Sequence, residues 1–256
     1  MEKIQAYRSW IYLLALLLLL PALLINLGVL TLIDDEGIRS LVALEMKLSG
    51  NWITPTLHGE YYYNKPPLYN WILLAFFSLT GVVNEFTARF PTVLALIGFS
   101  ATVYYFFRKH YSQKVAFLNA FFLITCGRIL LWDSMLALID TCFSWVMFSL
   151  FMVVYHDMEK ERYTRLFVFS YLLAAIGFLL KGLPSVVFLG ITLLAYFIYK
   201  RKFASLFSWR HVLGGMSFLL IVGAYYLTYH QNCTQQQHCT QQQHHPPTQY
   251  DHDTHE

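Results

Sequence analysis

The sequence has little charge and little cysteine, and these shortages exclude several classes of protein. Only 13% of its 256 residues are charged and 57% are hydrophobic, whereas soluble domains carry about 25% charged residues. The basic residues occur in short clusters between apolar runs and follow no amphipathic face, which excludes a nucleic-acid-binding surface. Two of the four cysteines, Cys126 and Cys142, lie in apolar runs, and Cys233 and Cys239 lie in a polar tail. This spacing fits neither a disulfide framework nor a zinc site.

Long apolar runs recur along the chain instead. A transmembrane helix needs about 20 apolar residues, and the runs predict an all-α, polytopic transmembrane bundle of about seven spans. The predicted spans are residues 11–33, 90–107, 115–132, 134–156, 166–182, 183–199 and 211–229.

The basic residues indicate an orientation. With the N-terminus in the cytoplasm, the short inside segments hold twelve of the eighteen Lys+Arg, as the positive-inside rule expects. Residues 66–83 are also apolar, but a span there would turn the later basic clusters outward. We therefore expect 66–83 to be a helix in the outer face, within one extracytoplasmic unit at 34–89.

Two other segments have a distinct character. Residues 38–49 combine an apolar and a polar face and are followed by Gly50, which predicts an interfacial amphipathic helix. Residues 231–256 are polar and contain CTQQQH twice. They are expected to be a disordered tail that follows the membrane region at 1–230.

Charged residues collect at the predicted outer face, and each has a structural and a functional interpretation. The carboxylates at 34–36 could cap a helix, and a lysine beside prolines could reach toward the lipid–water boundary. A carboxylate inside the membrane could pair with an arginine. The set comprises Asp34, Asp35, Glu36, Lys65, Arg89, Arg128, Asp133, Asp140 and Lys181. Asp133 and Asp140 are seven residues apart and are expected on one helical face, about 10 Å apart along its axis.

Such a set suits chemistry on an anionic, membrane-anchored substrate. Cations would hold a lipid phosphate and stabilise the charge that develops on it as it departs. A carboxylate could accept the proton of an attacking hydroxyl. Glycosyl transfer from a polyprenyl-phosphate sugar fits these residues, and other lipid-phosphate chemistry fits them nearly as well.

The stretch DDEGIRSLVALEMKLSGNWITPTLHGEYYYNKPPLYNWIL resembles the first outer loop of the membrane glycosyltransferases of the C superfamily. It is similar to the lipid A aminoarabinose transferase branch and, more distantly, to the protein O-mannosyltransferases. The pattern is an acidic pair, then E-M-x-x-S-G-x-W-x-x-P, then K-P-P-L-x-x-W, and EFTARFP and LLKGLPS resemble later landmarks. The resemblance covers about residues 8–229. It implies inverting transfer from an undecaprenyl- or dolichyl-phosphate sugar to a lipid, glycan or protein acceptor at the outer face of a bacterial inner membrane, with no tightly bound cofactor.

The resemblance also implies roles for single residues. The family's acidic pair falls on Asp35 and Glu36, which makes both expected catalytic residues, and Asp35 is the expected catalytic carboxylate of the pair. It would be a general base for a hydroxyl acceptor and a positioning group for a lipid-phosphate acceptor. Lys65 matches the donor-phosphate lysine. Three further cations are expected near that phosphate: Arg89, Arg128 and Lys181.

The chain also departs from the family pattern. Ile38 stands where the family often has an arginine three positions after the aspartate, and Arg39 follows it. Either Asp133 or Asp140 could fill the acidic position after Arg128. Family members continue through more spans and an outer domain, so the resemblance implies a truncated and inactive front part as one outcome.

Two other functions remain open at this level. A transporter or flippase for a lipid-linked anion would carry charge on both sides of the membrane midplane, whereas the predicted intramembrane charge lies in the outer half. A purely structural subunit would bind no donor.

Overall fold

The computed structural model describes residues 2–62 and 64–244, with side-chain surroundings for residues 10–62 and 64–232. Helices dominate this part of the chain. The elements are α1 (Glu2–Leu24), α2 (Asp35–Ser49), β1 (Thr56–Leu57), β2 (Glu60–Tyr61), α3 (Leu68–Thr80), α4 (Glu85–Arg108), α5 (Gln113–Thr125), a π-helical turn (Ile129–Asp133), α6 (Ile139–Glu159), α7 (Tyr163–Lys181), α8 (Pro184–Tyr199), a 3-10 turn (Phe203–Phe207) and α9 (Trp209–His244). The predicted all-α class is confirmed.

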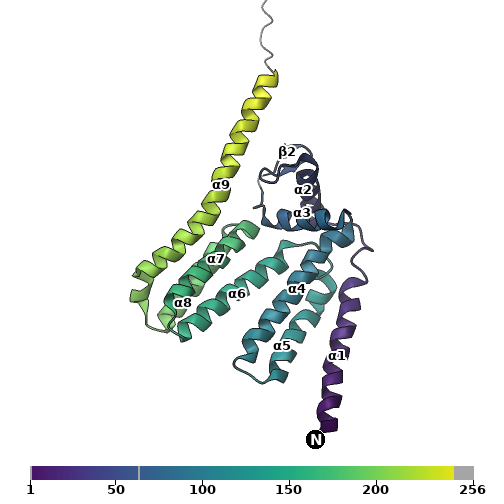
Figure 1. Ribbon diagram of the computed structural model, residues 1–256, viewed down its shortest axis with the longest axis vertical. Helices are drawn as coiled ribbons and strands as arrows, with labels where there is room; N and C mark the ends of the chain where they lie inside the picture. The colour runs from purple at the N-terminus through teal and green to yellow at the C-terminus, as the bar shows by residue number, and fades with distance from the viewer. Residues whose placement is uncertain (1, 63, 245–256) are drawn as a thin grey trace, which may run out of the picture.

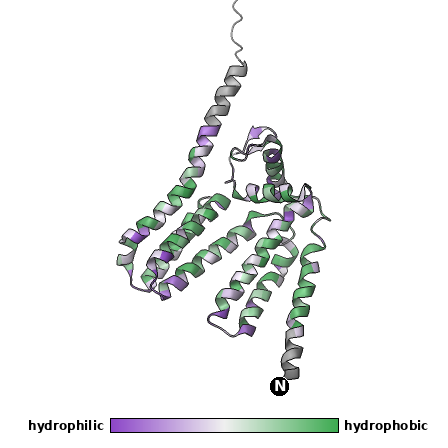
Figure 2. Ribbon diagram, in the orientation of Figure 1, coloured by the Kyte–Doolittle hydropathy of each residue, from purple (hydrophilic) through white to green (hydrophobic). Residues whose placement is uncertain are grey.

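Helices α4 to α9 form a layered bundle, with α1 at one edge (Figure 1). Most residues of these helices are hydrophobic, and hydrophilic residues collect at the turns and in the α2–β2 region (Figure 2). A large core joins α3, α4, α6, α7 and α8, and a smaller one joins Leu23 and Leu27 to Val93, Leu96 and Ile124. The bundle thus presents apolar faces both inward and outward, which suits a lipid environment.

Each predicted span coincides with a helix, although the lengths differ. Helices at Glu85–Arg108, Ile139–Glu159, Tyr163–Lys181 and Trp209–Asn232 are long and apolar enough to cross a membrane. The other three predicted spans correspond to shorter apolar helices at Trp10–Leu24, Gln113–Thr125 and Pro184–Tyr199. The N-terminal end lies at one end of the bundle together with three basic turns, which are residues 108–114, 160–165 and 200–210. Helices α2 and α3 lie at the other end (Figure 1).

Helix α3 occupies most of residues 66–83 and lies across the ends of the bundle helices (Figure 1). It has 13 residues, as α5 has, so its orientation across the bundle ends and not its length distinguishes it from the predicted spans. Gly81 ends it in a left-handed conformation, and Asn84 and Thr87 then form a capping box that starts α4.

Three boundaries differ from the sequence-based expectation. Helix α2 begins at Asp35, not at residue 38. The predicted first span ends as a helix at Leu24. Helix α9 continues to His244, through residues 231–244 of the predicted disordered tail, and its glutamines are good helix formers. The rest of that tail, 245–256, lies outside the described residues.

The expected pairing of Asp133 with Asp140 on one helical face is wrong. Asp133 ends the π-helical turn, whereas Asp140 lies in the first turn of α6, which begins at Ile139. The Ser134 hydroxyl donates to the Leu130 carbonyl, and the Ala137 amide donates to Glu36 at 2.9 Å. A buried acceptor from α2 therefore takes the place of a helical hydrogen bond and keeps 134–138 out of the helix.

A β-hairpin is fastened to α2 by Glu45. Its turn residues His58 and Gly59 have φ values of 55° and 80°, a combination typical of two-residue hairpin turns. Glu45 accepts hydrogen bonds from the Thr56 hydroxyl at 2.6 Å and from the amides of His58 at 2.6 Å and Gly59 at 3.3 Å. The Thr56 hydrogen bond is the main cause that lowers the pKa of Glu45.

We expect Glu45→Gln to destabilise the hairpin by on the order of 1 kcal/mol at pH 6, because these contacts are partly exposed. A lowered folded-state pKa stabilises the protein above the unfolded pKa of about 4.3 and is lost as pH falls through the folded value. The difference from wild type should therefore shrink below about pH 4. Thermal unfolding curves at several pH values measure it, and a constant difference would contradict the assignment.

Candidate functional site

The buried pair of Glu36 and Arg89 anchors α2 to the bundle. Both side chains are almost completely buried. Arg89 donates from Nη2 to Glu36 Oε1 at 2.7 Å and from Nε to Oε2 at 3.1 Å. Its remaining N–H groups donate to the carbonyls of Leu27, Leu30 and Thr31 at 2.8–3.0 Å. All five donors of the guanidinium are thus used.

The carboxylate of Glu36 is equally occupied. It also accepts the amides of Ile33 at 2.8 Å and Ala137 at 2.9 Å. The pair therefore joins the chain after α1, the start of α2, helix α4 and the loop before α6. With no free donor and no water-facing oxygen, we assign Glu36 and Arg89 a structural role, in place of the catalytic and phosphate-binding roles expected from the sequence.

Asp35 and Lys65 meet on the accessible side of α2. Lys65 Nζ lies 3.7 Å from Asp35 Oδ2, and the two side chains are 36% and 34% exposed. The first turn of α2 carries Asp35, and Lys65 precedes Pro66 and Pro67, which lead directly into α3. Because proline restricts itself and the residue before it, the lysine approaches from a constrained backbone. The carboxylate and the ammonium are thus close together and reachable from solvent.

A second ion pair lies beside this one. Lys181, the last residue of α7, pairs with Asp140 in the first turn of α6. Gly182 follows it with a φ of 80°, and a Cβ there would lie 3.9 Å from Pro66 Cγ. The end of α7 therefore packs against the turn that carries Lys65. The structure brings two carboxylates and two lysines to one end of the bundle, as the sequence predicted.

The remaining predicted residues take no part in these two pairs. Arg128 is 81% exposed and lies 3.6 Å from Asp133. Asp34 precedes α2 with a φ of 53° and an exposed side chain, and it forms no side-chain cap for the helix. Roles in binding for these three residues stay predictions.

Sequence reasoning gave no role to Arg39, which the structure places against Asp35. Arg39 is completely buried, and its Nη2 lies 3.7 Å from Asp35 Oδ2. The ring of Tyr62 lies 5.5 Å from its guanidinium carbon. The signal that could have revealed this contact is the four-residue spacing from Asp35, which puts both side chains on neighbouring turns of α2.

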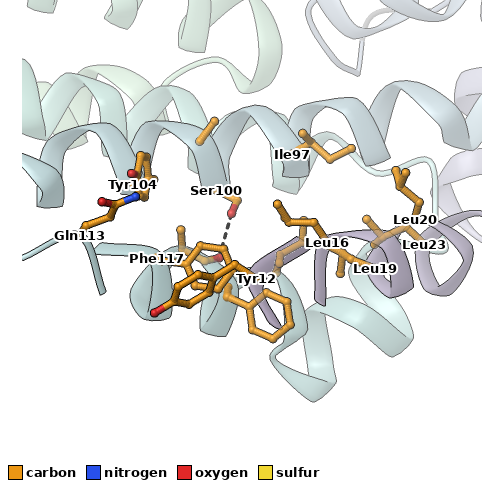
Figure 3. Close-up of a pocket in the computed structure, with 14 residues that line it drawn as sticks. Tyr12, Leu16, Leu19, Leu20, Leu23, Ile97, Ser100, Tyr104, Gln113 and Phe117 are labelled. Carbon is orange, nitrogen blue, oxygen red and sulfur yellow. Dashed lines mark hydrogen bonds between the residues drawn. The ribbon is translucent and has the colours of Figure 1, made fainter. Parts of the chain in front are cut away.

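An apolar cavity of about 570 Å³ lies elsewhere, between α1, α4 and α5. Figure 3 shows Leu16 and Leu19 facing it from α1 and Tyr104 and Phe117 at its other side. The Ser100 hydroxyl donates to the Ala120 carbonyl at 2.8 Å and so has a partner within the protein. Because its lining contains no charged side chain, this cavity offers no cation to a phosphate and no carboxylate as a general base.

Comparison with known proteins identifies one family. A model of the family described as dolichyl-phosphate-mannose-protein mannosyltransferase matches residues 64–227. The undecaprenyl phosphate-alpha-4-amino-4-deoxy-L-arabinose arabinosyl transferase of Shewanella sediminis is 25% identical over 193 residues, which are 73% of this chain and 34% of that protein. An uncharacterized protein of Aquifex aeolicus is 33% identical over 86 residues, 34% of this chain and 20% of its own length.

Solved structures show the same fold. The crystal structure of ArnT from Cupriavidus metallidurans in the apo state has a TM-score of 0.71 at 19% identity, covering 98% of this chain and 45% of that chain. The structure bound to undecaprenyl phosphate has a TM-score of 0.72 at 21% identity, covering 86% and 41%. This chain therefore spans about a third of the Shewanella relative and less than half of the solved ArnT chains.

Proposed function

Because the chain belongs to the dolichyl-phosphate-mannose-protein mannosyltransferase family, we propose that it carries the donor site of a glycosyltransferase that uses a polyprenyl-phosphate sugar. The observation that supports this most is the water-accessible pair of Asp35 and Lys65, 3.7 Å apart. The Shewanella sediminis relative is named as an undecaprenyl phosphate-alpha-4-amino-4-deoxy-L-arabinose arabinosyl transferase, and one solved neighbour is bound to undecaprenyl phosphate.

The two side chains supply the two functions that an inverting transfer needs. The ammonium of Lys65 holds the donor phosphate and stabilises its charge as the sugar departs. The carboxylate of Asp35 accepts the proton of an attacking hydroxyl. If the acceptor is itself a lipid phosphate, Asp35 orients substrate instead. Lys181 is the second cation available to the phosphate, because the end of α7 packs against the Lys65 turn.

The proposal places the chain in a bacterial inner membrane, with the N-terminus and basic turns in the cytoplasm. The end of the bundle that carries α2 and α3 then faces outward, where Asp35 and Lys65 meet a lipid-linked sugar at the membrane surface. The sugar is a pentose or a hexose, and the acceptor is a lipid, a glycan or a protein. No tightly bound cofactor is part of this proposal.

We expect Lys65→Ala to weaken binding of polyprenyl phosphate by about 10- to 100-fold, the value of one charge-assisted contact of 1.5–3 kcal/mol. Titration of the purified chain in lipid nanodiscs, followed by tryptophan fluorescence, measures this affinity.

The matched control is Lys114→Ala, which removes an exposed lysine at the opposite end of the bundle and should leave affinity unchanged. Wild-type affinity in Lys65→Ala would contradict the proposed donor site.

A further inference from the structure

Arg39 is a buried cation without hydrogen bonds to the described part of the chain. Its exposed fraction is 0%, and Nε, Nη1 and Nη2 have no acceptor among the described residues. Arg89 is equally buried, yet each of its N–H groups has a partner. The α2–α4 region therefore contains one buried guanidinium, that of Arg89, whose donors all have acceptors, and a second, that of Arg39, whose donors have none among the described residues.

The charge around Arg39 is also unbalanced. Arg39 Nη2 and Lys65 Nζ are both 3.7 Å from the same oxygen of Asp35. Two cations against one carboxylate leave one positive charge. Both distances exceed the 2.7–3.2 Å of a hydrogen bond, so Asp35 lies between the cations and forms a close contact with neither.

Other open polar groups lie in the same unit. Ser40 Oγ, Thr54 Oγ1 and both side-chain polar atoms of Asn70 are buried and have no partner among the described residues. Ser40 follows Arg39 in α2, and Asn70 lies in α3, which packs against α2. Leaving a buried charge and several buried polar groups unpaired costs a large share of a protein's net stability. A protein can retain such unpaired groups where a bound ligand supplies the missing hydrogen-bond partners.

We propose that Arg39 and Lys65 together form an oxyanion site that takes the phosphate group of the donor lipid, with Asp35 as the side chain that the phosphate displaces. The inference rests on the proposed function and deepens it by adding a buried cation, Arg39, to the exposed lysines named there. A guanidinium presents paired donors that match two phosphate oxygens, whereas lysine acts as a point charge. Phosphate enters from the accessible side, past Asp35 and Lys65.

Displacement has a consequence for Asp35. A phosphate bridging the two cations removes the positive charges that hold the carboxylate between them. Asp35 is then free to turn toward an acceptor hydroxyl. Donor binding would thus prepare the carboxylate for its role in transfer.

The test is Arg39→Met, which replaces the cation with an apolar side chain of similar length. Without ligand we expect its thermal midpoint to rise by about 2 °C or more, because an unpaired buried charge is removed. Its affinity for polyprenyl phosphate should fall about 10-fold or more. The matched control is Arg89→Met, whose midpoint should fall, because it strands the Glu36 carboxylate. A lower midpoint with unchanged affinity in Arg39→Met would overturn the proposal.

Two further measurements separate the possible outcomes. Titration with inorganic phosphate, in parallel with polyprenyl phosphate, distinguishes a site that binds the phosphate group alone from one that also needs the lipid chain. Weaker binding of either ligand to Arg39→Met supports the proposal. If Arg39→Met does not fold, Arg39→Lys provides the test. We expect a folded protein that binds polyprenyl phosphate at least about 3-fold more weakly, and wild-type affinity would overturn the inference.

The Lys65 variant separates this inference from the proposed function. Unchanged affinity in Lys65→Ala contradicts the proposed function. Weaker binding in Lys65→Ala, together with wild-type affinity in the Arg39 variants, refutes this inference alone.

Discussion

Glu36→Ala is expected to destabilise the chain by about 3–5 kcal/mol, the typical cost of removing one partner of a buried ion pair. The substitution leaves Arg89 charged and buried, with carbonyl groups alone around it. The amides of Ile33 and Ala137 also lose their acceptor. Four segments that meet at this carboxylate would separate, so the loss should exceed that of an ordinary surface change. Thermal unfolding in detergent micelles measures it.

Glu60→Gln is the matched control, because Glu60 is an exposed carboxylate in the hairpin that Glu45 joins to α2. Its unfolding midpoint should stay near that of wild type, since exposed charges contribute little. A Glu36→Ala protein as stable as the control would show that the buried pair does not hold α2 in place.

Asp35→Asn is expected to reduce sugar transfer by about 100-fold or more, in keeping with the usual contribution of a general base. The amide keeps the size of the carboxylate but cannot accept a proton. Affinity for polyprenyl phosphate should be unchanged or tighter, because the variant no longer presents a carboxylate to Lys65. Release of free polyprenyl phosphate from the sugar-loaded donor, in membranes that contain the chain, measures transfer.

Glu60→Gln is the control for this prediction too, because it removes an exposed carboxylate outside the predicted set of site residues. Transfer by this variant should match wild type. Wild-type transfer by Asp35→Asn would remove Asp35 from the mechanism.

Local patterns in the sequence were sufficient for much of the fold. The length of each apolar run predicts a helix, because a helix satisfies its own backbone within one segment. The positions of the basic turns kept residues 66–83 out of the span count, and α3 indeed lies across the ends of the bundle helices (Figure 1). The motif around Lys65 and the acidic residues after α1 indicated one outer site, where Lys65 and Asp35 lie 3.7 Å apart.

Long-range contacts decided the rest. The sequence pattern did not show that Asp35 is accessible to water, or that Glu36 is buried against Arg89, 53 residues later. Nor could it show that Ala137 donates to Glu36 and so delays the start of α6.

The sequence by itself determined the helices, their order and the end of the bundle that carries charge, since these depend on hydropathy and spacing along the chain. Only the tertiary structure decided which charges pair and which remain open. Arg89 has hydrogen-bond acceptors and Arg39 lacks them in the described part of the chain, because different segments pack against each guanidinium. Since both side chains are buried, water cannot replace a missing acceptor, and the unpaired charge lowers stability.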